Sequence, residues 1–236
     1  MPTTTFNIDA LKKDLDTNIT TQQLSESITS LGTEVEGIEE DKITVEVFPN
    51  RPDYLSRAGL IYGLKGKLGI KKGLPTIHVT ESPKKLVVEK PVTDIRPITH
   101  CFRVKDLVLT EALVNELIAL QEKLHVTYGR GRSKCAIGMY DDDKISWPIR
   151  YTAENPKKIS FVPLGESKVQ TGEEILRNHK KGKAYKHLLE GCKAYPIFVD
   201  NESTILSMPP IINSEAIVNV TPRTTSTFVE CSGRKY

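Results

Sequence analysis

The amino-acid sequence predicts an α+β protein in which a small N-terminal α/β domain, residues 1–78, precedes a larger mixed α+β domain, residues 79–236. Segments with the helical repeat of apolar residues alternate with short segments in which every second residue is apolar, the repeat of a half-buried strand. A proline-rich and charged stretch, residues 71–97, separates the two groups of segments. At 236 residues the chain is long enough to bury a sizeable core.

The smaller domain is expected to contain a helix, a strand and a second helix. In residues 21–31 the apolar side chains recur at helical spacing, and Gly32 follows as a typical C-terminal stop. "KITVEVF", residues 42–48, alternates apolar and polar residues and predicts a strand with one buried face. Pro52 can then open a helix. Its expected apolar stripe consists of Leu55, Ala58, Ile61, Leu64 and Leu68.

Residues 71–97 contain four prolines between short Val/Leu runs, which predicts a crossing segment with an edge strand. A strand is expected in "HCFRVKDLVL", residues 100–109, after which Thr110 can cap a helix. The expected buried face of that helix consists of Leu113, Leu117, Leu120 and Leu124. Further strands are expected at 134–140, 145–152, 195–200, 204–208 and 226–231, with helices near 172–178 and 183–190.

Composition limits the classes of function. The 33 Lys and Arg nearly balance the 30 Asp and Glu, so the net charge of +3 gives no overall signature of nucleic-acid binding, and DNA is not expected as a partner. The four cysteines form no C-x-x-C pair and predict reduced thiols. No long apolar run or signal peptide is present, so we expect a cytoplasmic protein without membrane contact.

Two basic segments could contact RNA phosphates. "YGRGRSK" contributes Arg130, Arg132 and Lys134, but it lacks the pattern of a dinucleotide fingerprint or a P-loop. "RNHKKGKAYKH" contributes Lys180, Lys181 and Lys183 with an interleaved tyrosine, which could track a single strand. The alternative for the first is a solvated helix exit and for the second an ordinary charged helical face.

No metal site is expected. The adjacent carboxylates of "YDDDK", residues 140–144, could hold Mg²⁺, but between two strands such residues usually form a turn. His179, His187 and Cys192 do not match zinc spacing. No G-x-S-x-G elbow or other nucleophile signature is present, so a covalent hydrolase is not expected.

The most unusual stretch is "ILSMPPIINSE", residues 205–215. Pro209 and Pro210 cannot lie in a helix interior or a central strand, so the stretch predicts a stiff apolar connection that delivers Asn213, Ser214 and Glu215. Further polar residues occur on apolar strands, namely Ser207, Glu230 and Ser232. A carboxylate flanked by apolar residues, as at position 230, either faces water or is buried and awaits a hydroxyl donor.

Several long motifs, in order, resemble the beta chain of phenylalanyl-tRNA synthetase of the archaeal and eukaryotic cytosolic type. They are "LGTEVEGIEED", "ITVEVFPNRPDYLSRAGLIYGLKGKLGI", "LIALQEKLHVTYGRGRSKCAIGMYDDDKI", "ISFVPLGE" and "ILSMPPIINSE". The resemblance covers essentially the whole chain. It implies the N-terminal domain followed by the domain that edits mischarged tRNA(Phe), which hydrolyses the ester of Tyr-tRNA(Phe).

The resemblance also implies site residues and partners. Glu215 matches a glutamate that senses the tyrosine hydroxyl in bacterial-type relatives, and archaeal-type pocket positions fall on Phe198, Ser207, Glu230 and Ser232. Glu215 or Glu230 would accept the phenol proton, Ser207 and Ser232 would orient the ester and a water, and Pro209 and Pro210 would stiffen the wall. In such a synthetase the partners are tRNA(Phe) and an alpha chain, in a heterotetramer. ATP and Mg belong to the full enzyme, and no cofactor is expected for this part.

Three departures from the family pattern leave alternatives open. Tyr140 stands where the family usually has a histidine, "SGRK", residues 232–235, replaces T-G-T-D, and the chain stops at Tyr236 where relatives continue. The rival hypotheses are a non-catalytic scaffold for tRNA docking or subunit assembly, with an inactive pocket, and a free-standing editing factor.

Overall fold

The computed structural model describes residues 2–218 and 220–234 and contains two compact units. The first unit comprises the chain up to Thr80 together with Glu116–Tyr128, and the second comprises Glu81–Asn115 and the chain from Gly129 onward. The expected mixed fold, a small α/β part and a larger α+β part, is confirmed. The expected division at residues 78 and 79 stays a prediction, and the compact units differ from it by assigning residues 116–128 to the smaller unit.

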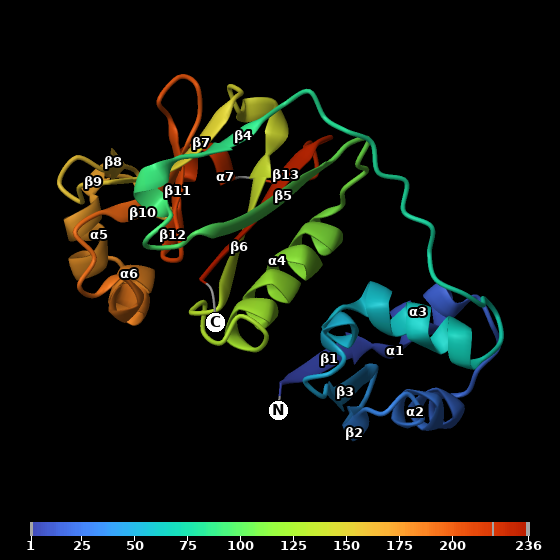
Figure 1. Cartoon of the computed structure of the whole chain (residues 1–236). Coiled ribbons are helices and arrows are strands. Elements are labelled where there is room, and N and C mark those ends of the chain that lie inside the picture. Colours follow the sequence, from blue (N-terminus) through green and yellow to red (C-terminus); the bar gives the residue numbers. More distant parts are fainter. Residues whose placement is uncertain (1, 219, 235–236) are drawn as a thin grey trace. The chain divides into compact units, whose positions relative to one another are not determined.

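The first unit contains a three-stranded sheet with strand order β1-β3-β2 and three α-helices before residue 80 (Figure 1). Its elements are β1 Thr3–Asn7, α1 Ile8–Leu15, α2 Thr21–Thr29, β2 Glu34–Glu39, β3 Lys42–Glu46, the 3₁₀ turn η1 Pro52–Leu55 and α3 Arg57–Lys67. The expected helix at 21–31 and strand at 42–48 are confirmed within their end residues.

The prediction of one helix starting at Pro52 is wrong in detail. A 3₁₀ turn ends at Leu55, and Ser56 then caps α3 by accepting a hydrogen bond from the Gly59 amide at 3.0 Å. The serine side chain competes for backbone donors and so starts a new helix rather than continuing the old one. A side chain at position 59 would meet the Asp53 carbonyl oxygen at 2.1 Å, so the close approach requires glycine there.

Helix α4, Glu111–Val126, contributes its later turns to the core of the first unit. Leu120 and Leu124 pack on the cluster that includes Leu11 and Leu60, as expected for the buried face. Thr110 caps the helix, accepting from the Leu113 amide at 3.2 Å, but Leu113 itself is exposed and its assignment to the buried face was wrong.

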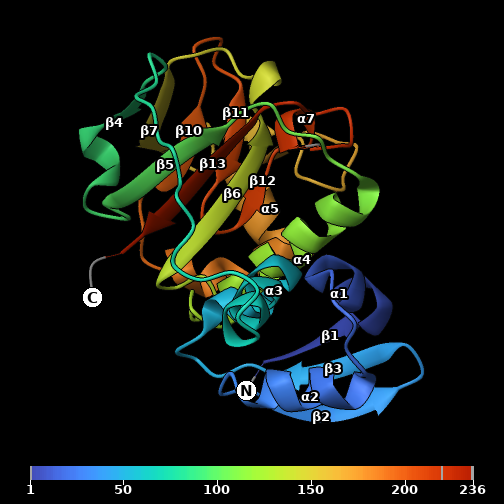
Figure 2. The same ribbon diagram turned by 90° about the vertical axis from the view of Figure 1, so that its right-hand side faces the viewer.

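The second unit is built on two main sheets. One has strand order β12-β11-β10-β7-β4 and the other β5-β13-β6. The strands of the first are β4 Leu86–Val88, β7 Ile149–Glu154, β10 Tyr195–Val199, β11 Ile205–Met208 and β12 Ile212–Asn213; those of the second are β5 Ile98–Val104, β6 Cys135–Asp141 and β13 Thr227–Gly233. Figure 2 shows β5, β13 and β6 side by side. The predicted edge strand in residues 71–97 is confirmed as β4, and every other predicted strand exists.

Short elements connect the sheets. They are η2 Lys90–Val92, η3 Asp142–Lys144, the paired strands β8 Ser160–Phe161 and β9 Gln170–Thr171, α5 Gly172–Asn178, α6 Lys180–Tyr185, η4 Lys186–Leu189 and α7 Glu215–Val218. The outer face of the five-stranded sheet, with Ile197 and Val199, packs in one core with Ile175 of α5 and Leu189 of η4. The inner face packs in a second core with residues of the three-stranded sheet, among them Tyr140 and Phe228.

No helix among the described residues has the length and apolar character needed to cross a membrane.

Candidate functional site

The candidate site lies between the inner faces of the two main sheets. Direct register pairs on neighbouring strands project their side chains to the same face. Tyr151 pairs with Phe198, Phe198 with Ser207 and Ser207 with Asn213, which forms one row across four strands. On the three-stranded sheet the pairs Phe228 with Tyr140, Glu230 with Gly138 and Ser232 with Ala136 form the facing set.

Three side chains from the two faces meet in what we call the phenol cluster: Tyr140, Ser207 and Glu230. The Tyr140 hydroxyl lies 2.8 Å from Ser207 Oγ and 3.2 Å from Glu230 Oε1, so it can donate to either oxygen. All three are buried, with exposed fractions of 0%, 1% and 2%. The cluster is therefore a polar site inside an otherwise aromatic and aliphatic core.

Gly138 makes room for the cluster. A Cβ at this position would stand 2.2 Å from the Tyr140 hydroxyl oxygen and 2.6 Å from Glu230 Oε1, closer than real Cβ atoms come to another atom. The tyrosine hydroxyl and the carboxylate therefore occupy the space above a glycine, and any other residue there would separate them.

Glu230 has an unusual electrostatic environment. Its Oε2 is fully buried and has no hydrogen-bond partner among the described residues. Burial raises the pKa of Glu230 to about 8, against the opposing effects of the Arg96 charge and the hydrogen bond from Tyr140. Burial and the Glu230 charge also raise the pKa of Tyr140 well above its usual value, so the phenol stays protonated. At neutral pH Glu230 is then mostly a neutral acid with an unused oxygen, an arrangement typical of functional sites.

A buried arginine holds the neighbouring serine. Arg96 is 1% exposed, and its Nε donates to Ser232 Oγ at 3.2 Å while its Nη2 donates to the Ser232 carbonyl at 2.7 Å. The same Nη2 reaches the Arg132 carbonyl at 3.2 Å, and the Tyr151 hydroxyl donates to the Arg96 carbonyl at 3.0 Å. Ser232 accepts from the guanidinium, so its own hydroxyl proton can be donated, and a hydrogen bond from Ser232 is one of the effects that lower the pKa of Glu230.

The double-proline segment forms the tight turn between β11 and β12. Pro209 and Pro210 are buried central residues of the turn, closed by the Ile211 amide on the Met208 carbonyl at 2.9 Å. Their expected exclusion from helix and central strand is confirmed. Ser214 is also buried, and its amide donates to the Leu206 carbonyl at 2.8 Å.

Arg132 supports this turn instead of facing solvent. Its Nη1 donates to the carbonyls of Ile211 at 2.9 Å and Pro210 at 3.2 Å, and its guanidinium lies 4.6 Å from the centre of the Tyr185 ring. With 7% exposure, Arg132 cannot meet an RNA phosphate while these contacts hold, so the expected RNA contact is replaced by a structural role. Its neighbour Arg130 is exposed and Lys134 is half-buried.

Glu215 lies apart from the phenol cluster. It is the first residue of α7, is half-buried, and its Oε2 accepts a hydrogen bond from the Gly165 amide at 2.7 Å. In residues 2–218 and 220–234 no hydrogen bond joins it to Tyr140, Ser207 or Glu230. Of the two candidate acceptors, only Glu230 belongs to the buried polar site.

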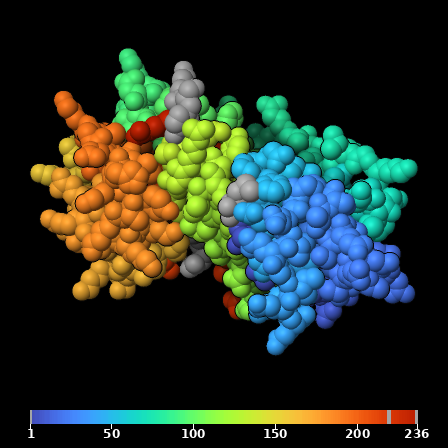
Figure 3. Space-filling view, turned by 90° about the horizontal axis from the view of Figure 1, so that it is seen from below, coloured from blue at the N-terminus to red at the C-terminus, as the bar shows by residue number. Residues whose placement is uncertain are grey.

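The second basic segment remains accessible. Lys180 and Lys183 of α6 are exposed, and Lys181 is half-buried. Helix α6 belongs to the orange surface in Figure 3. The contact of these lysines with RNA phosphates stays a prediction.

The acidic segment is a 3₁₀ turn, as its composition predicts, and its carboxylates are used internally. Asp142 is 1% exposed and accepts hydrogen bonds from Arg103 Nε at 2.9 Å and Trp147 Nε1 at 3.0 Å. Burial alone would raise the pKa of Asp142, but bonds from Arg103 and Ser226 and the charge of Lys84 hold it below its usual range. Within the described residues no group of three or more His, Cys, Asp or Glu could hold a metal ion.

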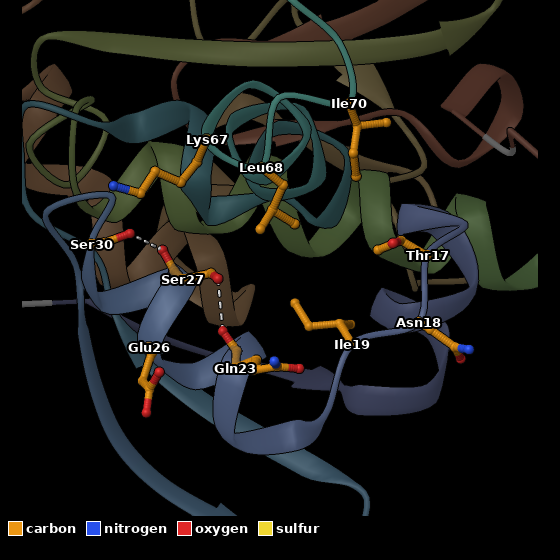
Figure 4. A pocket seen from close by; sticks show the side chains of 10 residues that line it. All are labelled: Thr17, Asn18, Ile19, Gln23, Glu26, Ser27, Ser30, Lys67, Leu68 and Ile70. Carbon is orange, nitrogen blue, oxygen red and sulfur yellow. Dashed lines mark hydrogen bonds between the residues drawn. The ribbon is translucent and has the colours of Figure 1, made fainter.

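Two open grooves of about 490 Å³ each lie elsewhere on the described surface. The groove of the first unit lies between α2 and the end of α3 (Figure 4). Ser27 and Ser30 on its wall donate to carbonyls of their own helix at 2.7 Å, so they do not converge on a ligand. The groove of the second unit is lined by Arg234 and by two acidic residues, Asp94 and Glu190. Lys235 lies outside the described residues.

The sequence patterns did not indicate three residues of the site: Arg96, Gly138 and Tyr151. Tyr151 lies on an expected strand and could have been found by its alternation. Arg96 stands in an irregular proline-rich stretch, where no periodicity indicates burial.

Comparisons with known proteins give one consistent result, although no family model matches the chain. It is 40% identical over 99% of its length to the phenylalanine–tRNA ligase beta subunit of Archaeoglobus fulgidus and 36% identical over 99% to that of Methanosphaera stadtmanae. The chain spans 42% of the length of these relatives. Its fold matches the crystal structure of an N-terminal fragment of the phenylalanyl-tRNA synthetase beta subunit from Pyrococcus horikoshii. That match has a TM-score of 0.93 at 35% identity and covers 99% of this chain and 69% of that chain.

Proposed function

Because this chain belongs to the family of phenylalanyl-tRNA synthetase beta subunits, we propose that its larger unit hydrolyses tyrosine wrongly attached to tRNA(Phe). The proposed setting is a cytoplasmic synthetase that ligates phenylalanine to tRNA(Phe) with an alpha chain as partner. ATP and Mg²⁺ would act elsewhere in that enzyme, and editing by this part needs no cofactor.

The proposed reaction depends on reading one hydroxyl group. A hydrophobic pocket for phenylalanine rejects tyrosine poorly, but a site that hydrogen-bonds the hydroxyl rejects the analogue that lacks it. A buried acceptor left unpaired by phenylalanine costs about 1–3 kcal/mol, which corresponds to about 5-fold to 150-fold discrimination.

The observation that carries the proposal is the pairing of a phenol with Glu230 and Ser207. The two oxygens lie 3.2 Å and 2.8 Å from a tyrosine hydroxyl of the chain itself, in a site walled by aromatic rings. The unpaired Oε2 of Glu230 adds a buried polar atom whose pairing would be favourable. Glu230 is therefore the proposed hydroxyl acceptor, and Glu215 is not.

Hydrolysis in this proposal relies on positioning rather than on a nucleophile of the protein. Arg96 occupies a lone pair of Ser232, so the serine proton can be directed at the ester carbonyl oxygen as negative charge develops there. Ser207 would hold the ring end of the substrate. Water held next to an oriented ester gains rate from orientation and electrostatics. The exposed lysines of α6, Lys180 and Lys183, are the proposed contacts for the tRNA backbone.

The test is deacylation of Tyr-tRNA(Phe) and Phe-tRNA(Phe) by the purified chain. We expect selective loss of tyrosine, and we expect Glu230→Met to reduce the preference for tyrosine by at least 5-fold. Glu215→Met is the matched control and should keep the preference. An unchanged preference in the Glu230 variant would overturn the assignment of the acceptor.

One observation favours a second function, a non-catalytic scaffold for tRNA docking or subunit assembly. The Tyr140 hydroxyl already lies within hydrogen-bond distance of both Ser207 Oγ and Glu230 Oε1, so the site is filled without a substrate. Absence of turnover on both aminoacyl-tRNAs, together with retained tRNA binding, would favour the scaffold.

A further inference from the structure

The phenol cluster contains a phenol hydroxyl, from Tyr140, together with the two polar side chains that contact it, Ser207 and Glu230. The group that the proposed site would read is a phenol hydroxyl, and the chain supplies one from Tyr140. Its ring is stacked on Phe228, with centroids 5.7 Å apart and planes inclined by 27°, and Trp147 contacts the same phenylalanine edge-on at 5.2 Å. The tyrosine therefore has an aromatic wall and two polar contacts at its hydroxyl, the features a bound tyrosyl ring would need.

We propose that Tyr140 is an internal stand-in for the substrate ring, which occupies Glu230 and Ser207 in the free chain and is displaced when a tyrosyl group binds. The proposal rests on the proposed function, since it assigns the same acceptors to the substrate. It adds that the site is closed by its own residue and opens by exchange of one phenol for another.

The exchange has a simple energetic consequence. A tyrosyl ring that displaces Tyr140 restores the hydrogen bonds it breaks, whereas a phenylalanyl ring leaves both acceptors unpaired inside the protein. Occupation by Tyr140 weakens the apparent affinity for both substrates by the same factor, as for any site whose competent state is only partly populated. The ratio between tyrosine and phenylalanine is unchanged, but correctly charged Phe-tRNA(Phe) is kept out more completely.

The Tyr140 hydroxyl also provides a polar contact for two buried oxygens in the free chain. Without Tyr140 both Ser207 Oγ and Glu230 Oε1 would be buried without the contacts they now share with the tyrosine hydroxyl. Gly138 is part of the same arrangement, because any side chain there would occupy the place of the Tyr140 hydroxyl.

The direct test uses the Tyr140→Ala chain and two small probes, p-cresol and toluene, which differ only by the phenol hydroxyl. We expect p-cresol to raise the Tm of the variant and to bind at least 5-fold more tightly than toluene, and to leave the wild-type Tm unchanged at the same concentration. The control is Tyr140→Ala with Glu230→Met, in which the preference should fall below twofold. Equal binding of the two probes to Tyr140→Ala, or binding of neither to the folded variant, would overturn the proposal.

A second measurement decides the matter if Tyr140→Ala does not fold. Tyr140→Phe keeps the ring but loses the hydroxyl, so the resident ring holds the site less well. The proposal predicts a KM for Tyr-tRNA(Phe) at least 3-fold lower, with kcat unchanged, whereas a purely structural tyrosine would leave KM unchanged or raise it. If the wild type hydrolyses Tyr-tRNA(Phe) but Tyr140→Ala binds p-cresol and toluene equally, the stand-in role of Tyr140 is wrong and the proposed function stands. If Tyr140→Ala prefers p-cresol over toluene but neither the wild type nor any variant hydrolyses Tyr-tRNA(Phe), the proposed function is wrong and Glu230 remains the hydroxyl acceptor.

Discussion

Glu230 should make the stability of the larger unit depend on pH, and Glu230→Gln should abolish that dependence. The pKa of Glu230 is raised from its ordinary value of 4.5 to about 8. Between these two pH values the unfolded chain has lost the proton and the folded chain retains it. The free energy of unfolding therefore falls as pH rises from about 4.5 to about 8 and changes no further above that range.

The size of the effect follows from the shift of 8 − 4.5 = 3.5 pH units. At 1.36 kcal/mol per unit the loss approaches roughly 5 kcal/mol, a large share of the 5–15 kcal/mol typical of a domain. Glutamine keeps the shape and one acceptor oxygen but cannot ionise, so its contribution is the same at every pH.

Urea unfolding at pH values from 5 to 9 measures this directly. The chain has one tryptophan, Trp147, and its ring contacts Phe228, so its fluorescence reports on the unit that holds the phenol cluster. Subtracting the free energy of unfolding of Glu230→Gln from that of the wild type at each pH removes the contribution of the other titrating groups. We expect that difference to fall by several kcal/mol between pH 5 and pH 8. A difference that stays flat within about 1 kcal/mol would show that Glu230 ionises normally and is not desolvated.

Three other substitutions test the packing around the site by the same unfolding assay. Gly138→Ala places a Cβ 2.2 Å from the Tyr140 hydroxyl oxygen and should cost about 1–3 kcal/mol; a neutral effect would contradict the close contact. Arg96→Met leaves the Ser232 carbonyl and hydroxyl without their donor and should cost about 2–5 kcal/mol; a smaller loss would mean that the guanidinium is dispensable. Asp142→Asn weakens a buried ion-paired network and should cost about 3–5 kcal/mol at pH 7. Because the pKa of Asp142 is lowered, that cost should vanish as pH falls below 3.8, and persistence at low pH would contradict an ionic origin.

Much of the site was accessible from the local pattern. Strand alternation predicts that residues two apart share a face, which brings Glu230 and Ser232 together on β13. The pattern left open whether Glu230 faces water or the interior, and the packing of this face of β13 against the five-stranded sheet decides for the interior. Arg132 illustrates the reverse case, since its basic neighbours suggested RNA while its guanidinium binds backbone carbonyls.

Most of the helices and strands of the larger unit, the double-proline turn and most apolar faces follow from the sequence alone, because propensity, proline geometry and side-chain period act between near neighbours. Strands β1 and β2 and helix α1 of the first unit were not predicted. Which glutamate is buried, and that Tyr140 meets Ser207 and Glu230, depends on contacts 67 and 90 residues apart along the chain. Sheet pairing and the packing of two sheets set those contacts, and the desolvation that raises the pKa of Glu230 exists only after both sheets have formed.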